Sequence, residues 1–159
     1  MECLGKAHPR NRGFTIIEMV MVLIILAVVV VVVSSRPEAD RTELAVQMEI
    51  LKSHLRYAQL KAMNDEVPWG IHVPNSGSYV LYENNVQTSF LLPGERTQTH
   101  TLPATITVTA GVGKTYNFNH MGIPVDSGGT EIPTEQTITL SRGTASENIT
   151  IVNNTGFIP

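Results

Sequence analysis

The sequence predicts an α+β protein in which a long N-terminal helix packs on antiparallel β-sheets. Three observations predict this fold: an apolar run from Phe14 to Val33, an amphipathic stretch from Glu38 to about Asn64, and short β-branched runs from Val67 onward. Strands that follow one long helix, with no further helices between them, favour antiparallel sheets.

The apolar run contains twenty residues, of which only Thr15 and Glu18 are polar. Twenty helical residues span about 30 Å, the thickness of a bilayer core, so residues 14–33 are expected to form a transmembrane or assembly helix. A carboxylate near the end of such a helix costs on the order of a few kcal/mol unless a partner meets it, which makes Glu18 a candidate functional residue. The alternative is that Glu18 is a tolerated acid at the level of the lipid headgroups.

A boundary is expected at Ser34–Pro37, because proline disrupts a helix interior and pushes the residue before it out of the α region. Residues 34–66 then form an amphipathic helical segment. Its apolar residues recur at steps of three and four, so they share one stripe that we expect to seat a β-sheet. The stripe consists of Leu44, Met48, Leu51, Leu55, Ala58 and Ala62.

Residues 67–159 are expected to form a β-rich head, because short alternating or β-branched runs are separated there by glycine and proline turns. The expected strands are Pro68–Val73, Tyr79–Glu83, Ser89–Leu92, Ile106–Thr109, Tyr116–Asn119, Gln136–Leu140 and Asn148–Val152.

Charge and cysteine content constrain the organisation further. Residues 1–13 carry three basic side chains against one acidic side chain, and a basic segment before an apolar run stays in the cytoplasm, so the rest of the chain faces outward. The only cysteine, Cys3, lies in this leader, so the head has no disulfide and depends on its core. Without the leader the formal charge is 8 − 13 = −5, which disfavours a general nucleic-acid role.

The string from Gly13 to Glu18, between a basic leader and an apolar run, resembles the class III signal of type IV prepilins and type II secretion pseudopilins. In that family a membrane peptidase cuts after the glycine and methylates the new N-terminus. The resemblance implies that residues 1–13 are a cleaved leader, that Gly13 and Phe14 flank the cut, that Phe14 is N-methylated, and that Glu18 supports subunit assembly. A charged amine drawn into an apolar filament core would be costly, and a neighbouring subunit's carboxylate can neutralise it.

The head resembles the GspH/FimT group of minor pilins and minor pseudopilins through three looser motifs. These are the stretch Leu51–Gln59, the glycine turn Asn119–Pro124 and the ending Ile149–Ile158. The resemblance implies two antiparallel sheets packed on the helix. It also implies a subunit that joins, or primes, an envelope-spanning filament for type II protein secretion or type IV pilus biogenesis.

The same resemblance implies partners and a location. The partners are the prepilin peptidase, other pilin or pseudopilin subunits, the inner membrane and the assembly platform of the machine. The chain would cross the bacterial inner membrane once, with its C-terminal head in the periplasm, and would associate with the filament after assembly. Two alternatives stay open: a signal-anchored periplasmic binding domain, in which Glu18 is incidental, and a DNA-binding minor pilin. Residues 144–159 contain no Lys or Arg, which disfavours DNA binding.

The sequence predicts no enzyme, cofactor or metal site. No nucleophile elbow or phosphate loop is recognisable. The five histidines lack metal-ligand spacing, and each is expected at the surface or in a strand. The segment Asp126–Glu131 has oxygen atoms for calcium but not the fuller ligand pattern, so a plain loop is expected. Trp69 is expected to be a core or sheet-edge aromatic.

Overall fold

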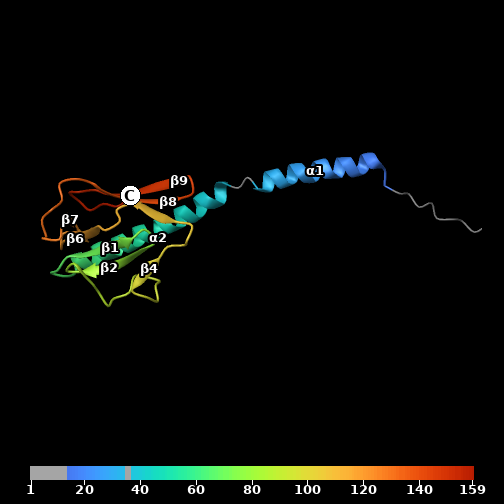
Figure 1. Ribbon diagram of the computed structural model, residues 1–159. Coiled ribbons are helices and arrows are strands. Elements are labelled where there is room, and N and C mark those ends of the chain that lie inside the picture. Colours follow the sequence, from blue (N-terminus) through green and yellow to red (C-terminus); the bar gives the residue numbers. More distant parts are fainter. Residues whose placement is uncertain (1–13, 35–36) are drawn as a thin grey trace, which may run out of the picture. The chain divides into compact units, whose positions relative to one another are not determined.

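The computed structural model describes residues 14–34 and 37–159, without the side chains of residues 32–40, and the chain divides into two units at residue 37. The first unit contains the helix α1 (Ile16–Ser34). The second unit, residues 38–159, contains the helix α2 (Pro37–Met63) from its second residue onward and every described strand (Figure 1). The helix α1 ends at Ser34 and the helix α2 begins at Pro37. These residues bound the segment where proline was expected to interrupt the helix.

The helix α2 is amphipathic, and its buried face is the predicted stripe. Leu44, Leu51, Leu55, Ala58 and Ala62 are fully buried, and Met48 is 2 % exposed. Side chains three and four residues apart lie on one face of a helix, so these six form a continuous apolar surface. The prediction that this stripe seats β-structure is confirmed, because its residues share one core with strand residues.

The strands form two antiparallel sheets. In the first sheet the order is β3-β2-β1-β6-β7, and β4 also pairs with β2; in the second the order is β5-β8-β9. The strands are β1 (Trp69–Asn75), β2 (Ser78–Glu83), β3 (Val86–Gln87), β4 (Thr99–Thr101), β5 (Thr107–Ala110), β6 (Thr115–Phe118), β7 (Pro124–Val125), β8 (Gln136–Arg142) and β9 (Ala145–Ile151). The predicted α+β class is therefore confirmed.

Both sheets bury one face in the core that contains the α2 stripe. Ile71 and Phe118 come from the first sheet, and Ile138 and Ile149 come from the second; all four are fully buried. Trp69 is 2 % exposed and its Nε1 donates to Asp65, 3.1 Å away, so its predicted place in the core is confirmed.

The expected strand Ser89–Leu92 is wrong, because this segment has no strand partner. The outer side of β2 is already paired with β3 at one end and with β4 at the other, which leaves no edge for the segment. Leu92 is nevertheless buried in the core, so the apolar pattern correctly indicated burial but not pairing. The last strand starts earlier than expected, at Ala145, because its ladder with β8 continues up to the hairpin turn.

The C-terminal segment is held against α2 by two polar side chains of the helix. Gln59 Nε2 donates to the carbonyl oxygens of Gly122 and Gly156, at 2.8 and 3.0 Å. Arg56 donates to the carbonyl oxygen of Ile158 at 2.9 Å, and Ile158 is itself buried. The close approach at Gly156 leaves no space for a side chain, because an added Cβ would collide with the Gly122 carbonyl oxygen.

One histidine corrects an expectation. His54 was expected at the surface or in a strand, but it lies on α2 and is 1 % exposed. Its Nε2 lies 3.0 Å from the Pro93 carbonyl oxygen, which can only accept, so Nε2 carries the proton and donates. Its Nδ1, 2.9 Å from the Tyr79 hydroxyl, then accepts. Two distant segments thus satisfy a polar ring whose burial the local sequence did not indicate.

Burial favours the neutral form of this imidazole. Desolvation lowers the pKa of His54 below the ordinary histidine value of about 6.5, and the nearby His100 lowers it further, while the Pro93 hydrogen bond and Glu95 oppose the shift. Burial also raises the pKa of Tyr79, which keeps its hydroxyl available as a donor. Because the folded state binds the His54 proton less readily than the unfolded state, folding stability is lost as pH falls below about 6.5.

We predict that Gly156→Ala destabilises the head more than Gly129→Ala. Both glycines have positive φ, 63° and 81°, so each alanine costs about 1–2 kcal/mol of backbone strain. Nothing lies within 4 Å of a Cβ at Gly129, whereas the Cβ at Gly156 collides with backbone and adds about 1–3 kcal/mol. Urea unfolding of the full chain in detergent micelles, followed by circular dichroism, measures both. Equal losses would contradict the close approach at Gly156.

We also predict that His54→Gln flattens the pH dependence of stability. The wild-type melting temperature should fall between pH 7.5 and pH 5, because protonation of the unfolded state competes with folding. Glutamine can still donate to the Pro93 carbonyl but does not titrate. The variant should therefore lose less melting temperature than the wild type over the same interval. Parallel curves for the two proteins would show that His54 does not contribute to this dependence.

Candidate assembly site

The N-terminus of α1 is capped by Thr15, which immediately precedes its first residue. The Glu18 amide donates to the Thr15 hydroxyl at 3.3 Å and to the Thr15 carbonyl at 3.1 Å, and the Met19 amide donates to the same carbonyl at 3.2 Å. Thr15 and Glu18 have the spacing of a capping box, in which an acid at the third helical position follows a capping hydroxyl. An acid in the first turn also interacts favourably with the helix dipole.

The structure places two of the three predicted site residues together at this helix start. Phe14 is 80 % exposed, and Glu18 is also exposed, one turn further on. Gly13 lies outside the described residues. Within the described chain Glu18 forms no ion pair, so its carboxylate is available to a group from outside. The geometry therefore allows the predicted contact with an amine of another subunit.

The described part of α1 is apolar on all sides. Every Ile, Leu, Met and Val from Ile16 to Val31 is between 45 % and 87 % exposed. A helix that is apolar all round needs cover from other helices or lipid, unlike an amphipathic helix seated on one sheet. None of the described helices combines the length and hydropathy that a membrane crossing needs.

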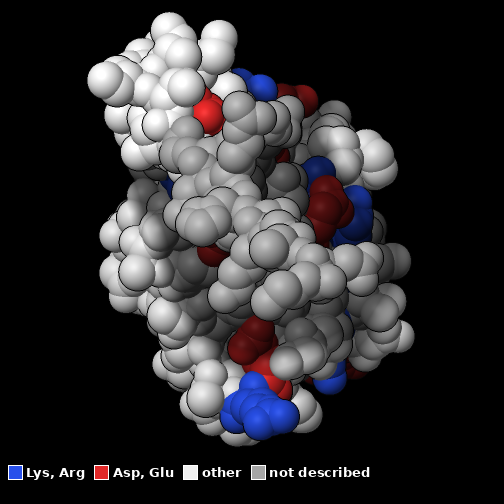
Figure 2. Space-filling model, turned by 90° about the vertical axis from the view of Figure 1, so that its right-hand side faces the viewer, with Lys and Arg blue, Asp and Glu red and all other residues white. Residues whose placement is uncertain are grey.

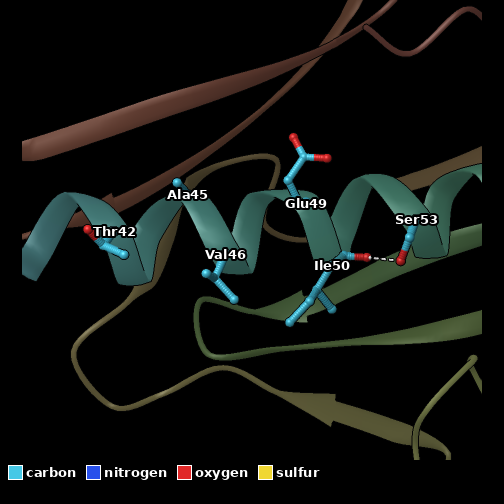
Figure 3. Close-up of a pocket in the computed structure, with 6 residues that line it drawn as sticks. All are labelled: Thr42, Ala45, Val46, Glu49, Ile50 and Ser53. Carbon is cyan, nitrogen blue, oxygen red and sulfur yellow. Dashed lines mark hydrogen bonds between the residues drawn. The ribbon is translucent and has the colours of Figure 1, made fainter.

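A second apolar surface lies on the outer side of α2, away from the buried stripe. It is a shallow groove of about 620 Å³, drawn in Figure 3. Val46 is 52 % exposed, and Ile50 projects to the same side of the helix. Ser53 donates to the Ile50 carbonyl at 2.7 Å, so its hydroxyl is satisfied locally. The groove residues are Thr42, Ala45, Val46, Glu49, Ile50 and Ser53.

Sequence analysis missed both the cap and this groove. The Thr-x-x-Glu spacing at Thr15–Glu18 was a usable signal for the cap. Val46 and Ile50 stand four residues apart, which was a usable signal for a second apolar face beside the main stripe.

Several basic side chains of the second unit make contacts within the chain. Lys61 Nζ lies 4.5 Å from the centre of the Phe90 ring and 5.3 Å from that of Trp69. Arg56 binds the Ile158 carbonyl, and Arg142 pairs with Glu43. In Figure 2 the visible acidic and basic side chains are scattered among uncharged ones. Phosphate binding needs several cations acting together, so this arrangement does not favour a DNA interface.

The loop considered for calcium uses its acid internally. Asp126 Oδ1 accepts the amides of Gly128 and Thr130 at 2.8 and 2.9 Å, which closes the turn. In the described parts of the chain no group of three or more His, Cys, Asp or Glu residues could hold a metal ion.

Comparison with known proteins supports the interpretation of the N-terminal motif and of the fold. Residues 8–34 match the family described as the prokaryotic N-terminal methylation motif. A crystal structure of the type IV minor pilin FimU from Pseudomonas aeruginosa matches with a TM-score of 0.54 and 21 % identity, covering 77 % of this chain and 91 % of that one. A second crystal form of FimU matches at 19 % identity with a TM-score of 0.49, covering 70 % and 86 %. None of the curated proteins matches this chain.

The comparisons therefore confirm the fold and the kind of N-terminus that the sequence predicted. This chain carries a prokaryotic N-terminal methylation motif at residues 8–34, followed by an α+β fold similar to that of the minor pilin FimU.

Proposed function

We propose that this chain is a minor pilin or pseudopilin subunit, cut between Gly13 and Phe14 and built through its N-terminal helix into an envelope-spanning filament. The observation that carries the proposal is that the methylation motif at residues 8–34 includes a helix with apolar side chains exposed all round. Before assembly, residues 14–33 anchor the chain in the inner membrane with the head in the periplasm. The filament belongs to a type II secretion or type IV pilus machine.

The role proposed for Glu18 follows from its position in the first turn of α1. A methylated Phe14 would still carry a positive amine in an apolar environment, and burying that charge alone is costly. The Glu18 carboxylate of a neighbouring subunit can pair with this amine. Removing one partner of such a buried pair costs about 3–5 kcal/mol, which is enough to control incorporation.

The α2 groove supports the same proposal from the side of the head. Exposed apolar side chains at Val46 and Ile50 can pack against a helix of a neighbouring subunit. The buried α2 stripe would keep the groove residues fixed on the head during such a contact.

We predict that the membrane-bound protein, expressed with an active prepilin peptidase, begins at a methylated Phe14. Peptidase action after Gly13 removes residues 1–13 and leaves one added methyl group on the new amine. Intact mass and N-terminal peptide mass spectrometry measure both changes. Expression with a catalytically inactive peptidase is the control and should leave the leader in place. A chain that stays uncut with the active enzyme would support the static anchored domain instead.

We further predict that Glu18→Gln and Glu18→Ala both reduce incorporation into filaments at least ten-fold without preventing cleavage. Glutamine can keep the capping-box contact but has no charge, so it separates the proposed ion pair from helix capping. Thr15→Ala is the matched control: it loses the capping hydroxyl, worth about 1 kcal/mol, and keeps the carboxylate. The readout is the amount of each variant in sheared filaments. Normal incorporation of Glu18→Gln would limit Glu18 to a capping role.

A further inference from the structure

Three aromatic rings lie around one ammonium group beside the C-terminal half of α2. The Nζ atom of Lys61 is 4.5 Å from the ring centre of Phe90 and 5.3 Å from that of Trp69. The ring centre of Tyr57, one turn earlier on α2, is 5.8 Å away. All three distances are within the roughly 6 Å over which an aromatic face attracts a cation. We call the three rings the aromatic cage.

Contacts that do not involve Lys61 hold the rings of the cage in place. Trp69 begins β1 and is 2 % exposed, and its Nε1 donates to Asp65 Oδ2 at 3.1 Å. The Phe90 ring centre lies 5.7 Å from that of Trp69, with the two planes at 58°. Tyr57 packs against the hydrophobic core. A preformed site of this kind loses little binding free energy to the ordering of its walls.

The cage lies at the surface of the head. Phe90 is 50 % exposed, and Lys61 is partly exposed. A lysine ammonium is carried on a flexible four-carbon stem, so it can turn toward solvent. Because Lys61 lies over the Trp69 ring, its departure would uncover an aromatic face. A ligand can therefore reach the cage once this one side chain moves aside.

The lysine ammonium is an incomplete match for the cage. It carries three N–H donors and is strongly hydrated. Among the described residues Lys61 has neither a hydrogen bond nor an ion pair, so the cage supplies no strong acceptor for these donors. A quaternary ammonium group has no N–H to satisfy, and its alkyl groups can contact the ring faces directly. Aromatic cages recognise ligands of this class.

A carboxylate beside the cage favours a cation over a neutral ligand. Asp65 Oδ1 accepts the Glu66 amide at 2.8 Å, while Oδ2 accepts the Trp69 indole N–H. Both oxygens are thus fixed, and the negative charge lies at the edge of the Trp69 ring. An opposite charge at this distance attracts a cation bound over the ring.

We propose that the aromatic cage of Tyr57, Trp69 and Phe90 is a binding site for a quaternary ammonium group, whose entry displaces the Lys61 side chain. The ligand class is a choline-type trimethylammonium compound. Free solutes and lipid headgroups both carry this group, so the two sources share the chemistry that the cage recognises. Lys61 acts as an internal competitor that keeps the cage closed to more weakly bound cations.

The test titrates the purified full chain, in non-ionic detergent micelles, with choline chloride. Trp69 is the only tryptophan of the chain, so its fluorescence reports the cage alone. We expect a saturable fluorescence change that sodium chloride at the same concentrations does not produce. The neutral isostere of choline, in which carbon replaces nitrogen, should leave the fluorescence unchanged. An isostere that binds as well as choline would overturn the recognition of a cation.

Removing the internal competitor should strengthen binding. The contact that Lys61 makes with the rings is lost in Lys61→Ala, so we expect the choline affinity to rise about ten-fold. Lys52→Ala is the matched control, because it removes the same charge from α2 at a residue that pairs with Glu49 instead. Its affinity should equal that of the wild type. An equal rise in both variants would assign the effect to net charge and contradict displacement of Lys61.

Removing one ring should weaken binding according to its distance. Phe90→Leu keeps an apolar side chain but loses the nearest ring, so we expect the choline affinity to fall about ten-fold. Tyr57→Leu loses the most distant ring and should have a smaller effect. Circular dichroism checks the fold of each variant, and either one that folds provides the comparison. Wild-type affinity in a folded Phe90→Leu would contradict binding in the cage.

The remaining outcomes decide between a ligand site and an internal contact. No saturable change in the wild type or in Lys61→Ala would overturn the proposal. Binding to Lys61→Ala alone would also overturn it, because the native cage would then be closed by its own lysine. Glycerophosphocholine, a soluble lipid headgroup, distinguishes the sources: tighter binding than choline indicates a lipid, and weaker binding indicates a free solute. These measurements use uncut chain and do not depend on cleavage at Gly13.

Discussion

The contact of one apolar helix stripe with two sheets is the constraint on which the head depends. Six residues of α2 are buried against strands of both sheets, and the only cysteine of the chain, Cys3, lies outside the head. Each fully buried leucine of the stripe contributes about 1.5–3 kcal/mol relative to exposure. Once the helix is seated, Arg56 and Gln59 project from it to the C-terminal segment, so the last residues are fixed by the same helix.

The features predicted from the sequence are those with a clear period. The steps of three and four from Leu44 to Ala62 specified the buried face of α2, and the longer strands followed alternation and turns. The strands β3, β4 and β7 have two or three residues, which is too short for a period, and their pairing depends on which edges longer strands leave open. His54 was misplaced for a related reason, because the groups that satisfy its ring, Tyr79 and Pro93, are distant in sequence.

The features of the candidate site were likewise predictable where their signal was local in the sequence. The spacing of Gly13, Phe14 and Glu18 is local, so the sequence alone was enough to predict all three as candidate residues. The cap formed by Thr15 was equally local but was not recognised. The groove at Val46 is different, because it depends on what the folded head leaves uncovered. A surface of that kind can be deduced only once the positions of the neighbouring elements are known.

The exposed surfaces of the two units place different demands on a partner. Apolar cover for α1 is non-directional and requires only surface removed from water. Cover for the α2 groove is more restrictive, because a partner must fit a surface on which Val46 and Ile50 project from one side of the helix.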